Sequence, residues 1–458
     1  MSVIPENSYR KTYGAAALGW AGFITYGSLV PFTLRDAPMS FQGISADDPV
    51  VALAHLGGLD WVTNILIGIL LAYLLMGTLG ATTGRRAGPV IATLLLCLSL
   101  SFCVEFAQTF VGGRVPSMGD VIAQSVGAII GLAAWVLLGR RLTRMIAISA
   151  AGGDGALRAA LLLMVFGYVG YALFPFGIIL PGRGVLAHFN HPGTFSLWPD
   201  DSAMGLRFIL LSLVKSLVLM PLGALVALNP HRPAKDGLVQ AIALGLLLSA
   251  FLMMCRVFFL WSGTDTVFSG LLRAAGAPMG YLVWRGLQRI DLEGLRRILR
   301  PTALIALPLY VAGLAGIRGI VGGASPDAEK IRVILEQLNW LPFYYDFAAS
   351  SIRAVASVGA VLVQYGILGV LLALVLGRRH APFLIVCLSI LIAMSLQIAA
   401  LLLAGLRPDP SNPILAAMGA LTGAAVVPWF FKAMAAHMEE VNRARPRQAA
   451  PATARATP

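Results

Sequence analysis

Carboxylate and amide side chains that could bind a ligand or move a proton lie near the ends of apolar segments in the first third of the chain. Helical spacing places Glu105 with Gln108 on one face, and Asp120 with Gln124 on one face of the next apolar segment. A carboxylate at membrane depth is costly unless it is paired or faces water, which makes it a candidate for function. The candidate cluster comprises Asp60, Asn64, Glu105, Gln108, Arg114 and Asp120.

Structural roles for the same residues stay open. Arg114 is a fork-shaped partner that could pair with Glu105 or with Asp120, and the three charges together could close a helical hairpin. Asp60 and Asn64 could cap the start of their helix. The sequence therefore favours a shared location for these side chains and leaves recognition and structure as alternatives.

A second group of chemically interesting side chains is cationic. Lys215, Arg256 and Arg273 stand in the outer thirds of three successive apolar segments. Basic pockets between helices bind lipid head groups, so these residues are a candidate site for a phosphate-bearing head group. The alternative is that each cation reaches the membrane surface independently by snorkelling.

Metal, cofactor and catalytic signatures are not expected in this sequence. The histidines are scattered, and His188 and His191 with Asp200 and Asp201 form only a weak zinc-like grouping. No glycine-rich phosphate loop or nucleophile elbow is visible. We therefore predict no catalytic residue, no metal, no cofactor and no bound nucleic acid, and we expect a non-enzymatic protein.

The elements that position these residues are membrane-spanning helices. The 458 residues are 58% hydrophobic and only 12% charged, with a mean hydropathy of +0.81, which excludes an ordinary soluble globule. Apolar runs of about 18 residues or more are long enough to cross a bilayer. We predict an all-α polytopic membrane protein with about twelve spans, near residues 15–30, 61–79, 88–110, 119–139, 158–180, 207–228, 236–260, 267–285, 301–322, 354–376, 382–405 and 412–434.

Charge distribution predicts the orientation of these spans. The chain carries 34 Lys and Arg against 21 Asp and Glu, and most of the cations fall in alternate connections, beginning with Arg10 and Lys11. Cytoplasmic loops are enriched in Lys and Arg, so both termini are predicted in the cytoplasm. The longer loops at 33–60, 181–206 and 323–353 are then predicted outside.

Internal repetition organises the spans into three four-helix units. A Pro-Phe pair is predicted to end a span at Pro31, Pro175 and Pro342, and a Gly-x-x-x-Gly motif recurs at nearly constant spacing. Small residues at this spacing let helices approach closely in lipid. The motif glycines are Gly127, Gly131, Gly276, Gly280, Gly419 and Gly423. The predicted divisions are residues 1–145, 146–300 and 301–436, followed by a disordered cytoplasmic tail at 437–458.

The first unit resembles the VanZ-like family of membrane proteins, which is named after a low-level teicoplanin-resistance protein. The residues that carry the resemblance are Pro31-Phe32, Asp60, Asn64, Glu105, Gln108, Arg114, Asp120, Gly127 and Gly131. The other units look like diverged copies, with Gln397 in place of Glu105 and Asn412 in place of Asp120 in the third. The full polar set is thus present only once.

This resemblance implies an envelope protein connected with glycopeptide antibiotic tolerance. Our leading hypothesis is a non-enzymatic protein that binds membrane lipids and a cell-wall or lipid-linked polysaccharide intermediate at the outer face. A transporter or flippase of such a lipid is the alternative, and an intramembrane enzyme using Glu105 or Asp120 as acid or base is a third. The sequence does not predict an oligomeric state.

Overall fold

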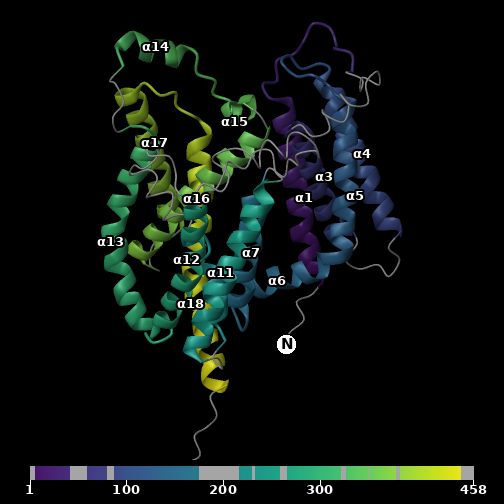
Figure 1. The fold of residues 1–458 in the computed structure, drawn as a ribbon. Helices are drawn as coiled ribbons and strands as arrows, with labels where there is room; N and C mark the ends of the chain where they lie inside the picture. The colour runs from purple at the N-terminus through teal and green to yellow at the C-terminus, as the bar shows by residue number, and fades with distance from the viewer. Residues whose placement is uncertain are drawn as a thin grey trace, which may run out of the picture.

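The computed structural model shows an all-helical membrane protein (Figure 1). It describes residues 6–41, 59–79, 87–174, 197, 216–229, 233–257, 266–320, 326–349, 351–377 and 382–444. Within these ranges, nine helices are long and apolar enough to cross a membrane. Large hydrophobic side chains such as Leu18, Leu137 and Phe383 are strongly exposed on the helix surfaces, as expected of residues that face lipid.

The helices of the first part of the chain are long and consecutive. They are α1 (Glu6–Leu29), α3 (Leu59–Leu79), α4 (Ala87–Gln108) and α5 (Met118–Ala134), and α5 continues through the π-helix η1 (Trp135–Gly139) into α6 (Arg140–Ala151). The middle part contains α7 (Ala156–Leu173), α10 (Met220–Ala227), α11 (Ala234–Val257) and α12 (Val267–Leu287). The last part contains α13 (Leu292–Ile317), α14 (Ala328–Glu336), α15 (Tyr344–Ala349), α16 (Ser351–Leu376), α17 (Pro382–Ala404) and α18 (Ser411–Ala444).

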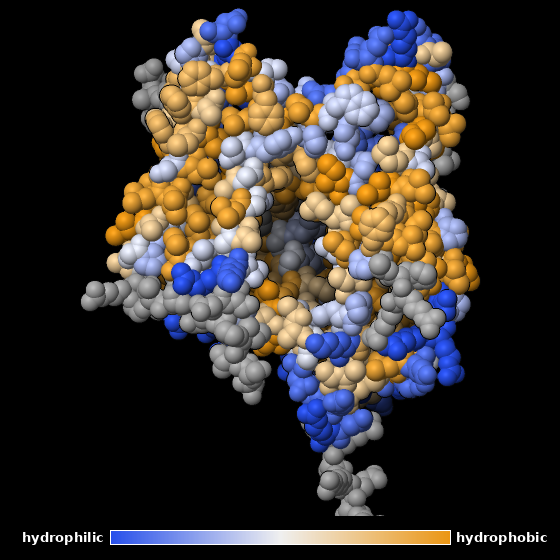
Figure 2. Space-filling model, turned by 180° about the vertical axis from the view of Figure 1, so that it is seen from behind, coloured by the Kyte–Doolittle hydropathy of each residue, from blue (hydrophilic) through white to orange (hydrophobic). Residues whose placement is uncertain are grey.

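All twelve predicted spans coincide at least in part with one of these helices. The three outside the nine are α1, α12 and the segment Ser216–Ala227, which is only a short apolar helix within the described residues. A count of twelve therefore remains a prediction. Figure 2 shows the surface expected of a membrane protein, with hydrophobic residues over the middle and hydrophilic residues gathered toward the ends.

Two predicted boundaries are wrong. Helix α18 continues through Ala444, past the start of the predicted tail at residue 437. The pair Pro342-Phe343 does not end a spanning helix, because it lies between the short helices α14 and α15. Pro31 does follow the end of α1 closely, whereas Pro175 lies outside the described residues.

The same close helix contact occurs three times along the chain. A Cβ built on Gly127 would lie 2.1 Å from the carbonyl oxygen of Ile65, which places the backbones of α5 and α3 in direct contact. The corresponding distances are 1.9 Å from Gly276 to the Ser216 oxygen and 1.9 Å from Gly423 to the Gly366 oxygen. Glycine is required at these positions because any side chain would displace the neighbouring helix.

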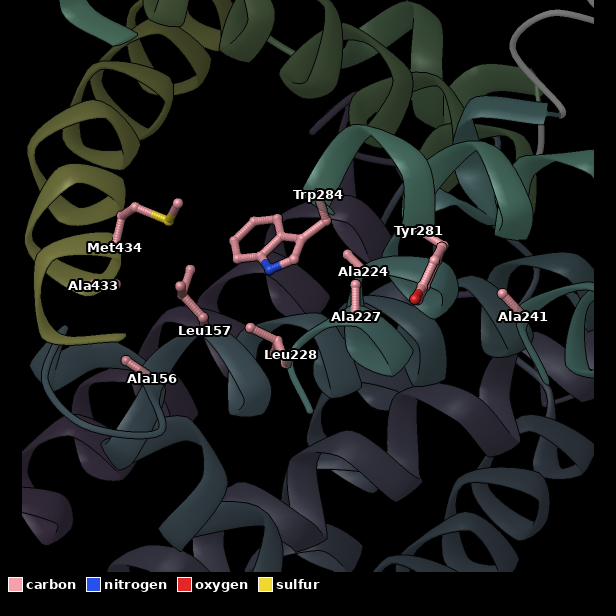
Figure 3. Packing of buried hydrophobic residues seen from close by; sticks show 10 residues of the cluster. All are labelled: Ala156, Leu157, Ala224, Ala227, Leu228, Ala241, Tyr281, Trp284, Ala433 and Met434. Atoms are coloured by element: carbon pink, nitrogen blue, oxygen red, sulfur yellow. The ribbon is translucent and has the colours of Figure 1, made fainter. Parts of the chain in front are cut away.

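The three parts of the chain also pack against one another. A buried cluster joins α7, α10, α11, α12 and α18 (Figure 3), in which Trp284 of α12 extends toward Met434 of α18. Trp429 of α18 donates a hydrogen bond from its indole nitrogen to the Ser149 carbonyl of α6 over 2.6 Å. Residues far apart in sequence are thereby held in a single assembly.

Both described ends of the chain lie on one side of this assembly. Figure 1 shows the start of α1 and the end of α18 toward the lower side, while α14 and the turn between α4 and α5 lie toward the upper side. For brevity, the upper side is called the outer end, following the predicted orientation. The polar cluster of the first unit lies at this end.

Candidate functional site

Glu105 closes the hairpin between α4 and α5. Its side chain is 2% exposed, and its Oε2 accepts a hydrogen bond of 2.9 Å from the backbone N–H of Ser117. Ser117 is the N-cap of α5, and its own hydroxyl accepts a bond of 3.1 Å from the N–H of Gly119. The carboxylate therefore satisfies a donor at a helix N-terminus, where the helix dipole favours negative charge.

Arg114 binds main-chain oxygens of α1 and the residues that follow it. Its Nε donates to the carbonyl of Val30 over 2.7 Å, and its Nη2 donates to the carbonyl of Gly27 over 2.8 Å. The prediction that Arg114 pairs with Glu105 or Asp120 is thus replaced by a different contact in the structure. The last carbonyls of a helix lack intrahelical partners, and a cation satisfies them while complementing the negative end of the dipole.

The segment that follows α1 also hydrogen-bonds the turn between α4 and α5. Thr33 accepts a 2.6 Å backbone bond from Gly112, and Arg35 donates its backbone N–H to Phe110 over 2.9 Å. The side chain of Arg35 also donates to the carbonyl of Arg114. The α4–α5 turn is therefore held by main-chain contacts that the residue types alone do not reveal.

Asn64 and Gln124 connect α3 to α5 below the carboxylates. Gln124 donates from Nε2 to Oδ1 of Asn64 over 2.9 Å, and Asn64 donates from Nδ2 to the carbonyl of Asp60 over 3.1 Å. The Asn64 side chain also hydrogen-bonds the carboxylate of Asp120, which lies close enough to Asp60 for their charges to interact. Asn64 stands beyond the first turn of α3, so it bridges two helices and does not cap its own.

The exposure of the carboxylates divides their roles. Glu105 and Gln108 are buried, Asp120 is half-buried and Asp60 is exposed. Asp60 and Asp120 are thus the acidic groups that an arriving molecule can reach. Hydroxyl, amide and amine hydrogens are the donors that such carboxylates accept, whereas a phosphate would be repelled by them.

The described residues contain no group of three or more His, Cys, Asp or Glu side chains suited to a metal ion. The cluster at the outer end of α3 and α5 is joined by hydrogen bonds. Gln124 belongs to it through its bond to Asn64, and its place on the helical stripe with Asp120 was the sequence signal for that contact.

The cationic group of the middle part is only partly visible. Lys215 and the side chain of Arg256 lie outside the described residues. Arg273 is in α12 and is 1% exposed, so its guanidinium lies inside the protein. Independent snorkelling of Arg273 to the membrane surface is inconsistent with this burial, and a shared head-group pocket stays a prediction.

Two amide side chains of the last part make hydrogen bonds around the turn between α17 and α18. Gln397 donates from Nε2 to the carbonyl of Asp409 over 2.7 Å, across the turn between α17 and α18. Asn412 accepts a 3.0 Å bond from Nη2 of Arg318, at the end of α13. A side chain therefore bridges this turn, and the equivalence of the two amides with Glu105 and Asp120 stays a prediction.

The first part of the chain matches a known family of proteins. Residues 7–139 match the family model VanZ/LLP1, which covers α1, α3, α4, α5 and η1. The model matches this region once, so it does not establish further copies. Neither a search of curated proteins nor a search of solved structures found a match to the chain.

Proposed function

We propose that the VanZ-like domain at residues 7–139 binds a lipid-linked cell-wall or polysaccharide intermediate at the outer face of the bacterial inner membrane. The proposal is carried by one observation, the gathering of Asp60, Asn64, Asp120 and Gln124 at one end of α3 and α5. Such intermediates present many hydroxyl and amide hydrogens, which match carboxylate and amide acceptors.

The different contacts of the residues in the cluster support binding over catalysis. Glu105 is engaged by the N-cap of α5, and Arg114 is engaged by Val30 and Gly27. Both residues hold the scaffold, which leaves Asp60 and Asp120 to meet the ligand. A general acid or base would need hydrogen-bond reach to a reacting group, and binding needs only the acceptors that the cluster presents.

The family link and the orientation complete the proposal. VanZ-like proteins are connected with glycopeptide resistance, and a protein that holds a cell-wall intermediate outside the membrane would compete with the antibiotic for it. This requires the α4–α5 turn to lie outside, with both termini in the cytoplasm. We further propose that residues 146–300 and 301–436 are diverged copies of the same unit.

The test is recovery of the bound lipid from detergent-purified full-length protein. Lipids that copurify are extracted and identified by mass spectrometry, for wild type, for the double variant Asp60→Asn with Asp120→Asn, and for Glu336→Gln. Glu336 is an exposed acid of α14, so its variant controls for lost charge. We expect a glycan-bearing lipid on wild type and on the control, and at least a tenfold loss on the double variant. The same lipid profile on wild type and on the double variant, at equal protein abundance, would contradict the proposal.

Transport of the same lipid is a second candidate. Figure 2 shows a hollow between two hydrophobic lobes of the protein, a feature through which a head group could pass. Reconstitution in vesicles with a fluorescent polyprenyl-phosphate lipid separates the two functions. Protein-dependent movement of the lipid between leaflets would favour transport, whereas binding without movement favours the leading proposal.

A further inference from the structure

Asp346 is a buried acid outside the VanZ-like domain. It belongs to the short helix α15 and is only 8% exposed. Among the described residues, its Oδ2 has no hydrogen-bond partner. Leaving a carboxylate oxygen buried and unsatisfied is costly, so a ligand at this oxygen would stabilise the folded state.

The surroundings of Asp346 are oxygen-rich and negative. Ser357, in the first turns of α16, gives the carboxylate a side-chain hydrogen bond, and the charge of Asp409 acts on it from the turn between α17 and α18. Asp409 is held in place by its own contacts, since its Oδ1 accepts a 2.9 Å bond from the N–H of Ser411. Asp346 therefore has a hydroxyl partner on α16 and lies within electrostatic reach of a second acid at the α17–α18 turn.

We propose that Asp346, Ser357 and Asp409 form a binding site for a monovalent metal cation, with Na⁺ as the probe. Carboxylate and hydroxyl oxygens are hard ligands that suit hard cations. The site offers two carboxylates, and the one on Asp409 already accepts a backbone hydrogen bond. A tight calcium site uses more acidic ligands than this. A single positive charge would neutralise the Asp346 carboxylate, whose Oδ2 has no hydrogen-bond partner among the described residues.

This site is adjacent to the VanZ-like domain through the next residue of α15. The Phe347 ring packs against Phe23 of α1 with the ring centres 5.3 Å apart, and it covers Gly27, whose carbonyl accepts a bond from Arg114. A cation at Asp346 would stabilise α15 and with it the end of α1. The cation site itself does not depend on the proposed function of the domain.

The experiment measures thermal unfolding of the detergent-purified full chain at constant ionic strength, with NaCl replacing choline chloride in steps. We expect the melting temperature of wild type to rise with Na⁺ and to follow the logarithmic dependence of a ligand that binds only the folded state. Asp346→Asn should abolish this dependence. Glu336→Gln, which removes an exposed acid from the same region, should keep it.

Two additions keep the result decisive. If Asp346→Asn fails to fold, Ser357→Ala should shift the Na⁺ midpoint to at least threefold higher concentration, because it removes one ligand oxygen. Binding of radioactive ²²Na⁺ to wild type, with competition by K⁺ and by Ca²⁺, identifies the ion directly. A wild-type melting temperature independent of Na⁺, or one that responds only to pH, overturns the cation site, and neither result would alter the lipid recovery expected at Asp60 and Asp120.

Discussion

Gly27 of α1 lies directly against the ring of Phe347 of α15. A Cβ built on Gly27 would stand 2.4 Å from Cε1 of that ring, and Tyr26 donates from its hydroxyl to the Pro342 carbonyl over 2.7 Å. The last part of the chain thus packs on the helix end to which Arg114 is bonded. The VanZ-like domain is therefore held partly from outside its own sequence.

Replacing Gly27 with alanine should destabilise this contact. The added methyl group overlaps Phe347, and overpacking costs about 1–3 kcal/mol of unfolding free energy. Gly22→Ala is the matched control, because a Cβ at this position of the same helix meets nothing within 4 Å. Thermal unfolding should show a lower melting temperature for Gly27→Ala only. The double variant with Phe347→Ala should recover part of the loss, and strictly additive effects would argue against direct contact.

Truncating Glu105 should loosen the α4–α5 hairpin. Glu105→Ala leaves the Ser117 N–H without its acceptor, which costs about 1–3 kcal/mol. Glu105→Gln keeps an oxygen acceptor and should retain most of the stability. Membrane abundance and melting temperature measure the effect. A loss of copurified glycan-bearing lipid in Glu105→Gln at normal abundance would show instead that the negative charge itself serves recognition.

A larger residue in place of glycine should disrupt each of the three close helix contacts. Gly131→Val, Gly280→Val and Gly423→Val all place a side chain against a facing carbonyl, and each should reduce the amount of folded protein in the membrane. Gly167→Val serves as the control, since a Cβ there meets nothing within 4 Å. Fluorescence-detected size-exclusion chromatography gives the folded fraction. Tolerance of any one of the three would show that its helix pair can separate without unfolding the chain.

Cysteine labelling tests the orientation at described, exposed positions. After replacement of the native cysteines, Gly113→Cys and Gln337→Cys should react with an impermeant maleimide in intact spheroplasts, and Asp154→Cys should react only after permeabilisation. Gly113 follows α4 and Gln337 follows α14 at the upper side of Figure 1, whereas Asp154 follows α6 at the lower side. The opposite labelling pattern would show that the protein has the opposite orientation, with the polar cluster on the cytoplasmic side.

Acid should stabilise the protein through Asp346 when Na⁺ is absent. Burial raises the pKa of this carboxyl above its ordinary value, the Ser357 hydrogen bond lowers it, and the charge of Asp409 raises it. A cation is present beside the same helix, since the guanidinium carbon of Arg407 lies 5.4 Å from the centre of the Tyr345 ring. Because the folded state then binds the proton more tightly than the unfolded state, this contribution to stability is lost as the pH rises through the folded pKa and is regained on acidification.

The corresponding measurement is the melting temperature from about pH 7 down to about pH 4, near the ordinary pKa of an aspartate carboxyl, in choline chloride, for wild type and for Asp346→Asn. The variant cannot titrate at this position and should show a flatter profile. Addition of Na⁺ should flatten the wild-type profile too, since the ion and the proton compete for the same oxygen. Identical profiles for the two proteins would exclude Asp346 as the responsive group.

The sequence by itself determined the all-helical membrane class, the approximate course of the helices and the VanZ-like character of the first part. Apolar length and polar spacing within one helix are local properties, so they can be read along the chain. The bridge from Asn64 to Gln124 lies within reach of this reasoning, because both stand on polar faces at the same end of their helices.

Only the tertiary structure decided which helices meet and what the charged groups touch. Helices in lipid associate through close packing without a hydrophobic force between them, so the apolar pattern does not name the partner. Arg114 binds carbonyl oxygens of Val30 and Gly27, and every residue carries such an oxygen, so no residue type marked the contact. The burial of Asp346 likewise depends on tertiary packing, because it belongs to a short helix whose next residue, Phe347, packs against α1.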